Sequence, residues 1–290
     1  MKKLLTMIMT AVLGASALSA QQVKTETTAA SLFWRSDSLQ VAEIVTEPGD
    51  YYRKVGHHGP AVENTYMALR IYFNDSGAID VYSKSGRGME LMKYLWYPSA
   101  EDRQSLELGY DDYRVGKTVG LGGIALWDGK EMVRLEVTKG RTARVGKTKK
   151  GAYAEMVAYG VPYCGDHVDI CIRIDVTSKT RDAVVTATEL TGKKVSFVTG
   201  VNWHEGQKVS FDEGYVSVWG PHPDGKGNMS KPIGSGMFYN AKDFESVTKT
   251  DDMIRLISRP ASRISTRVVA ASTREAELNN AKRFEAYMMK

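Results

Sequence analysis

Two adjacent histidines, His57 and His58, lie between glycines in the most polar segment of the chain, and a proline follows closely. Glu63, Asn64 and Arg70 come next, so that all five side chains fall within 14 residues. Imidazole titrates near neutral pH and suits acid–base catalysis, whereas guanidinium and amide groups can bind a carboxylate. The spacing predicts an ordered loop that presents acid–base groups at a sheet edge. The alternative is a pair of surface or hydrogen-bonded structural histidines.

A second polar cluster places two aspartates between tyrosines. Tyr110, Asp111, Asp112 and Tyr113 are consecutive, and Lys117 follows them. Carboxylates accept hydrogen bonds from sugar hydroxyls, and aromatic rings stack on the apolar faces of sugars. This pattern indicates sugar binding, and the alternative is a polar loop whose tyrosines pack inward. Neighbouring residues of a strand point to opposite faces, which disfavours the two aspartates as a facing catalytic pair.

Two further histidines stand next to tryptophans at the ends of expected strands. Trp203 precedes His204, and Trp219 lies three residues before His222. Loops at strand ends commonly build sites on a rigid sandwich, so each pair is a candidate sugar platform. Both tryptophans could equally be core residues.

Alternation of apolar and polar residues dominates the chain and predicts half-buried strands separated by turns. Convincing helices are few: a short one over Gly88–Leu95 and a C-terminal one within Thr273–Met288. The expected fold is therefore all-β, a large β-sandwich with a short C-terminal helix. The expected strands cover residues 66–73, 132–137, 168–176, 183–188, 195–198 and 215–219.

The first twenty residues have the layout of a cleavable secretory signal. Lys2 and Lys3 precede an apolar run from Leu4 to Leu18, and the small residues Ser19 and Ala20 close the segment. No cysteine lies near the cleavage site, which excludes a bacterial lipid anchor there. We expect a signal peptide over 1–20, a single mature β-sandwich domain over 21–290, and a periplasmic location without a membrane anchor.

Charge and cysteine content limit the partners. Loss of the two leader lysines takes the formal net charge from +5 to +3, which is too weakly basic for a nucleic-acid binder. Residues 139–150 carry six basic side chains and no acidic one. They form either a solvated hairpin loop or a rim that attracts an anionic polymer. Cys164 and Cys171 could pair in an oxidising compartment or remain free thiols.

Several longer motifs resemble those of a large family of secreted Bacteroidetes proteins that is catalogued as a domain of unknown function. They are residues 56–64 (GHHGPAVEN), 115–124 (VGKTVGLGGI), 218–223 (VWGPHP) and 272–279 (STREAELN). That family is typically encoded in polysaccharide-utilisation loci, often near unsaturated-uronyl hydrolases. The resemblance implies a β-supersandwich similar to galactose mutarotases and some polysaccharide lyases. It supplies no list of catalytic residues.

These observations favour β-elimination on a uronic-acid-containing oligosaccharide, by a lyase or a dehydratase. The reaction needs a group that neutralises the carboxylate, a base for the C5 proton and an acid for the oxygen leaving C4. Arg70 and Asn64 are the candidates for the carboxylate, and His57 or His58 for the base. The candidate acids are Tyr113, Tyr110 and His204. The expected partner is an anionic oligosaccharide, and the reaction needs no cofactor.

Three other functions stay open. An epimerase or mutarotase would pair His204 or His58 with Glu63 or Asp112. A glycoside hydrolase would use two carboxylates, here Glu63 with Asp112. A non-catalytic glycan-binding protein would need the aromatic residues but not the histidine loop. A divalent metal held by His57, His58 and Asp112 is a further alternative.

Overall fold

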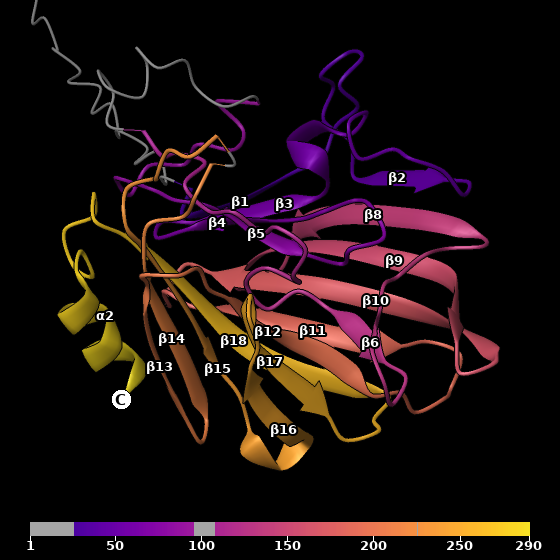
Figure 1. Ribbon diagram of the computed structural model, residues 1–290. Coiled ribbons are helices and arrows are strands. Elements are labelled where there is room, and N and C mark those ends of the chain that lie inside the picture. The colour runs from indigo at the N-terminus through magenta and orange to yellow at the C-terminus, as the bar shows by residue number, and fades with distance from the viewer. Residues whose placement is uncertain (1–25, 96–107, 225) are drawn as a thin grey trace, which may run out of the picture.

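The computed structural model describes residues 26–95, 108–224 and 226–290, and the fold of this part is all-β and sandwich-like (Figure 1). One layer is a nine-stranded antiparallel sheet. Its strands, in spatial order, are β13 (Lys208–Asp212), β14 (Tyr215–Gly220), β15 (Ile233–Phe238), β18 (Arg263–Ser272), β11 (Ala183–Glu189), β10 (Asp166–Thr177), β9 (Gly151–Tyr163), β8 (Gly140–Lys147) and β2 (Glu43–Thr46).

Two smaller antiparallel sheets form the second layer. The four-stranded sheet contains β1 (Thr28–Ser31), β3 (Ala61–Asn64), β4 (Ala68–Ile71) and β5 (Ile79–Tyr82), and it packs on β8, β9 and β10. The five-stranded sheet packs on β14 and β15. It contains β16 (Phe244–Lys249), β17 (Met253–Ser258), β12 (Phe197–Asn202), β6 (Ala125–Trp127) and β7 (Met132–Val133). The 3-10 turns η1 (Gly56–His58) and η2 (Ala241–Asp243) lie outside the sheets.

The core lies between the two layers and follows the predicted alternation. In β10, Val168, Ile170, Ile172 and Ile174 are buried, and the residues between them are half exposed. Burial of such a side chain contributes about 1.5–3 kcal/mol. The expected strand over 132–137 is much shorter, since the backbone N–H of Leu135 turns away from the sheet to donate to Asp75.

The one α-helix in the described residues is α2 (Ala281–Met288), which lies on the outer side of β14 and β15 (Figure 1). Asn280 caps it by accepting a hydrogen bond from the Arg283 N–H, so the helix begins later than Thr273. Phe284 and Met288 are buried against Gly234 and Gly236. A Cβ on Gly234 would lie 2.7 Å from the Phe284 ring, so only glycine lets the helix approach this closely.

The predicted helix over Gly88–Leu95 is wrong. Residues 90–94 make a single turn, in which the backbone N–H of Tyr94 donates to the Glu90 carbonyl. The backbone N–H groups of Glu90 and Leu91 donate to the Glu63 carboxylate, which fixes the start of this turn from a neighbouring strand.

The basic segment 139–150 is not a solvated loop, because most of it is strand β8. Arg141 is buried, Arg144 pairs with Glu43, and Lys147 pairs with Glu26. These two carboxylates neutralise Arg144 and Lys147, which are two of the six basic side chains in the segment.

Cys164 and Cys171 form no disulfide. Cys164 is exposed in the turn between β9 and β10, where its φ is 50°, and Cys171 lies half buried within β10. The predicted signal peptide falls outside the described residues. None of the described helices is both long and apolar enough to cross a membrane.

Candidate functional site

The outer face of the four-stranded sheet carries two cross-strand rows of side chains. Ala61, Arg70 and Asp80 are register partners in one row, and Glu63, Ala68 and Tyr82 are partners in the next. The intervening residues of these strands point into the core, as alternation requires. The two alanines are small, so they leave a hollow between the longer side chains around them.

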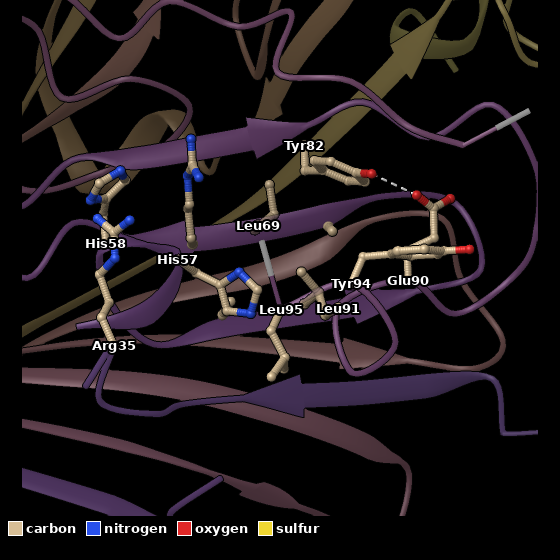
Figure 2. Close-up of a pocket in the computed structure, with 12 residues that line it drawn as sticks. Arg35, His57, His58, Leu69, Tyr82, Glu90, Leu91, Tyr94 and Leu95 are labelled. Atoms are coloured by element: carbon tan, nitrogen blue, oxygen red, sulfur yellow. Dashed lines mark hydrogen bonds between the residues drawn. The ribbon is translucent and has the colours of Figure 1, made fainter. Parts of the chain in front are cut away.

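This hollow is a pocket of about 650 Å³, counting the space that is open to solvent. Figure 2 shows His57, His58 and Arg35 at one end and Tyr82, Glu90 and Tyr94 at the other. Arg70, Leu91 and the two alanines also line it.

The 3-10 turn η1 brings both histidines to the pocket in an uncommon backbone conformation. His57 has φ 53° and His58 has φ 61°, in the left-handed region that non-glycine residues rarely adopt. His57 Nε2 lies 3.0 Å from the Ser31 hydroxyl, which also contacts the Gln40 amide. The edge of the Phe33 ring packs on the same imidazole. Burial lowers the pKa of His57 to about 3, so this imidazole is neutral at physiological pH.

His58 is held so that one ring nitrogen remains available. Its Nδ1 lies 3.1 Å from the Tyr52 carbonyl oxygen, and the Tyr52 ring stacks on it at a centroid distance of 4.3 Å. A carbonyl can only accept, so Nδ1 carries the proton of the neutral ring and Nε2 carries the lone pair. No hydrogen bond to Nε2 is present among the described residues. Burial lowers the pKa of His58, and the positive charges of Arg70 and Arg35 lower it further.

Arg70 is fixed by a carboxylate network on the same face. Its Nε donates to Asp80 Oδ2 at 2.8 Å, and a second guanidinium nitrogen reaches Asp111 at 3.3 Å. The Tyr72 hydroxyl donates to the same Asp80 oxygen at 2.6 Å. Burial by itself would lower the pKa of Arg70, but the two aspartates more than offset it and the net shift is upward. Arg70 is therefore a permanently charged, well-oriented group in the wall of the pocket.

Glu90 and Tyr82 form the opposite end. The Tyr82 hydroxyl donates to Glu90 Oε2 at 2.7 Å, and the backbone N–H of Gly109 donates to the same oxygen at 2.9 Å. Glu90 is only 4% exposed. Burial raises the pKa of its carboxyl group despite these hydrogen bonds.

Glu63 and Asn64, two of the predicted substrate ligands, are structural. Lys84 Nζ lies 2.8 Å from the Glu63 carboxylate, and both groups are buried. The Asn64 side chain accepts from the backbone N–H of Met67 and donates to the Thr180 carbonyl. Their hydrogen-bonding groups are used inside the fold, so neither is placed to bind a substrate.

The predicted aspartate–tyrosine cluster is also largely occupied. Asp112 is buried and accepts from Ser83 and Arg274. The Arg274 guanidinium lies 3.7 Å from the centre of the Tyr110 ring, and so covers one of its faces. Lys117 is exposed in a turn and does not line the pocket.

The alternative metal site, made of His57, His58 and Asp112, does not form, because Asp112 is bound to Ser83 and Arg274 instead. Within the described residues no three His, Cys, Asp or Glu side chains could hold a metal ion.

Tyr113, His204 and His222 form a separate cluster that does not line the pocket. His222 is 2% exposed, and the backbone N–H of Arg114 donates to its Nδ1 at 3.1 Å. Because that nitrogen is an acceptor, His204 Nε2, also 3.1 Å away, must be a donor. The Tyr113 ring packs on His222 at 4.6 Å. Burial, with a smaller effect of His204, lowers the pKa of His222 to about 3.

The two tryptophans are packing residues. Trp219 is buried against Phe284 of helix α2. Trp203 donates through Nε1 to the Thr250 carbonyl, and Lys249 lies over its ring at 3.9 Å. Neither ring presents a free face to a sugar in the pocket.

The structure thus brings together His57, His58 and Arg70 of the predicted site and adds residues that the sequence did not single out. The additions are Arg35, Tyr52, Tyr72, Asp80, Tyr82, Glu90 and Tyr94. The strand β5 held one usable signal, since alternation places Asp80 and Tyr82 on a single face. The partner strand and its register were needed to show that this face is also that of Arg70.

Comparisons with known proteins place the chain in a family. Among solved structures, a 4-alpha-glucanotransferase from Thermococcus litoralis matches with a TM-score of 0.34 and 12% identity. The match covers 80% of this chain and 42% of that enzyme, so the chain spans less than half of its length. The comparison with curated protein sequences returned no match. The family model described as a domain of unknown function (DUF4861) matches residues 12–290. The expected resemblance to a family of unknown function is confirmed, and the protein belongs to the DUF4861 family.

Proposed function

We propose that the pocket on the outer face of the four-stranded sheet catalyses β-elimination on a uronic-acid-containing oligosaccharide. The observation that supports this proposal most strongly concerns His58. Its Nε2 has a lone pair available for a proton, and it lies near the positive charges of two arginines. Its Nδ1 is committed to the Tyr52 carbonyl, and Arg70 and Arg35 provide the positive charge. A neutral base beside cations is the arrangement that removal of a proton next to a carboxylate requires.

The chemistry follows from the charges. A substrate carboxylate at the arginine end would be stabilised by Arg35 and Arg70, and this stabilisation grows as negative charge develops in the enediolate. The bound anion would also raise the pKa of His58 and make it a stronger base while substrate is present. Arg70 is already oriented by Asp80, so little reorganisation accompanies binding.

The histidine roles divide between the two neighbours. We assign His58 as the base because its Nε2 has no competing partner among the described residues. His57 is a positioning residue, since its Nε2 contacts Ser31 and its pKa of about 3 makes it too weak a base. The hydrogen bond to Ser31 anchors η1, so that His58 keeps its place.

The other enzymatic alternatives have less support. The epimerase and hydrolase hypotheses needed Glu63 or Asp112 as a free carboxylate. Glu63 forms an ion pair with Lys84, and Asp112 forms one with Arg274. His204 and Tyr113, the earlier candidate acids, are members of the other cluster and do not line the pocket.

We further propose that the mature chain is a single exported domain that acts in the periplasm. An oligosaccharide is then a better candidate than an intact polymer, because a periplasmic enzyme acts downstream of glycan import. Its product would carry a C4–C5 double bond, so an enzyme that hydrolyses unsaturated uronides would consume it.

The test follows the ultraviolet absorbance of that double bond during incubation with uronate oligosaccharides. Pectic, ulvan-type and glycosaminoglycan fragments serve as substrates. We expect a rise with the wild type, its loss in His58→Gln, and its retention in His167→Gln, which replaces an exposed histidine at the start of β10. New reducing ends without absorbance would indicate hydrolysis, and exchange of anomers by proton NMR would indicate a mutarotase. Binding without any product would leave a glycan-binding protein.

A further inference from the structure

We propose that the Glu90 end of the pocket is a subsite for an uncharged sugar, whose hydroxyl group binds Glu90 while the uronate of the same oligosaccharide lies at His58. This inference rests on the proposed function, which supplies the sugar at His58. Glu90 comes from the turn that follows β5, and not from any of the sequence motifs above. Its role here is to select the sugar, and it takes no part in proton transfer.

The strand register indicates that the two ends of the pocket hold different sugars. The backbone N–H of Phe73 donates to the His58 carbonyl, whereas Ala68 is the register partner of Tyr82. Positions 68 and 73 are five residues apart along β4 and its continuation. Five extended residues span about 16 Å, or roughly three sugar residues. A group bound beside Tyr82 therefore belongs to a sugar other than the one whose proton His58 would take.

The lining of the pocket changes from basic to apolar to hydroxyl- and carboxyl-bearing along this length. Figure 2 labels members of these three groups in that order, which are Arg35 with His58, Leu91 with Leu95, and Tyr82 with Glu90 and Tyr94. Arg70 is on the histidine side of the Tyr82 row. Among the described lining residues, no arginine, lysine or histidine belongs to the Glu90 end. Apolar and aromatic side chains suit the apolar face of a sugar ring.

Glu90 keeps one carboxyl oxygen for a ligand. Its Oε2 accepts from the Tyr82 hydroxyl at 2.7 Å and from the Gly109 N–H at 2.9 Å. Its Oε1 makes no hydrogen bond within the described part of the chain, and it is not one of the unpartnered polar atoms that are sealed from solvent there. The carboxyl group is therefore oriented through one oxygen, while the other opens to the pocket.

The protonation of Glu90 favours a hydroxyl over a second carboxylate. Burial raises the pKa of Glu90 most strongly, and the Glu63 charge adds to this. The Gly109 N–H, the Tyr82 hydroxyl and Lys84 lower it, but the net shift is upward. A sugar hydroxyl both donates and accepts, so it can bond to either form of the carboxyl group. A sugar carboxylate only accepts, so the ionised form would repel it.

The nearest ammonium groups are not placed to attract a second uronate. Lys84 Nζ lies 2.8 Å from the Glu63 carboxylate, and both groups are buried. Lys93 Nζ lies 5.1 Å from the centre of the Tyr94 ring, within the range of a cation–π contact. Neither lysine lines the pocket. An uncharged sugar is therefore the better ligand for this end.

The test measures the binding of three synthetic probes by titration calorimetry. The first is a disaccharide of glucuronic acid and glucose, and two trisaccharides extend it at the glucose by a further glucose or a further glucuronic acid. We expect the wild type to bind the glucose-ended trisaccharide about 3–10-fold more tightly than the disaccharide, which is the gain from one hydrogen bond. The glucuronate-ended trisaccharide should bind no more tightly than the disaccharide.

Two substitutions of Glu90 should change this pattern in different ways. Glu90→Ala should lose the gain from the added glucose and keep the affinity for the disaccharide. In Glu90→Gln, the amide oxygen can keep the donors Tyr82 and Gly109, while the NH₂ group replaces Oε1. This variant should bind both trisaccharides more tightly than the disaccharide, because it hydrogen-bonds without a charge. Glu131→Ala and Glu131→Gln, at an exposed position, are the matched controls.

A second readout uses pH. The affinity ratio of the glucose-ended to the glucuronate-ended trisaccharide should rise with pH in the wild type, because Glu90 ionises as the pH passes its raised pKa. The ratio should stay constant in Glu90→Gln. A residue that only supports the fold would not alter the dependence of this ratio on pH.

The outcomes separate the subsite from the elimination. Equal affinities of the three probes for the wild type, or no binding of any probe, overturn the subsite. An equal loss of affinity for the disaccharide and the glucose-ended trisaccharide in Glu90→Ala also overturns it. A wild type that shows the expected affinities but forms no unsaturated product overturns only the elimination, whereas one that eliminates without distinguishing the probes overturns only the subsite.

Discussion

Tyr52 contacts His58 twice, since its ring stacks on the imidazole at 4.3 Å and its carbonyl oxygen lies 3.1 Å from Nδ1. The stacking fixes the plane of the imidazole, and the hydrogen bond fixes its tautomer. Together they aim the lone pair of Nε2 while the backbone of His58 stays in the left-handed region. A residue that is strained in this way persists only where its surroundings hold it, which is common at functional sites.

The pH dependence of activity should depend on the positive charges near His58, because they lower its pKa. Arg35 lowers the pKa of His58, so Arg35→Gln should raise it and move the acidic limb of kcat/KM to higher pH. The shift can be measured from pH profiles and from NMR titration of the imidazole. An unchanged limb in Arg35→Gln would contradict His58 as the titrating base.

Stability should fall in acid because two imidazoles are kept neutral. His57 and His222 titrate near pH 6.5 in the unfolded chain but at about 3 in the folded protein. Between these values the unfolded state binds protons that the folded state refuses, so stability is full above about pH 6.5 and declines toward pH 3. Each histidine should contribute about 1.4 kcal/mol per pH unit in that window. Denaturant unfolding of His57→Gln should show a shallower decline than His167→Gln, and equal slopes would be inconsistent with a buried neutral His57.

The buried Lys84–Glu63 pair should be sensitive to the loss of one partner. Lys84→Met leaves the Glu63 charge buried and should lower the free energy of unfolding by about 3–5 kcal/mol. The double variant Lys84→Met/Glu63→Gln should recover part of this loss, because no charge is then left unpaired. Lys193→Met, which breaks an exposed pair with Asp166, should cost less than about 1 kcal/mol. Similar losses for both lysines would mean that burial of the first pair has little effect.

Filling the floor of the pocket should separate binding from folding. Ala68 is buried and lines the pocket, so the two added methyl groups of Ala68→Val would occupy substrate space. We expect at least a ten-fold loss in kcat/KM with a Tm within a few degrees of the wild type. Ala276→Val, at an exposed position, is the control. Normal kinetics in Ala68→Val would place the substrate elsewhere.

The all-β fold and part of the pocket could be predicted from the sequence because their signals are local. Alternation within β10 or β14 needs only neighbouring residues. His57, His58 and Arg70 meet because η1 leads directly into the β3–β4 hairpin, so short chain segments bring them together. The helix over 88–95 was predicted wrongly, since a distant carboxylate, that of Glu63, holds these residues as a single turn.

Only the tertiary structure decided which polar residues belong to the site. Glu63 and Glu90 have the same side chain, but Lys84 and two backbone N–H groups hold Glu63 inside the fold, whereas Glu90 lies in the pocket wall. Tyr113 and His222 lie 109 positions apart, yet their rings pack together and away from His58. The physical reason is that a residue type sets what a group can do, whereas long-range strand register and burial set which partners it meets and which protonation state it keeps.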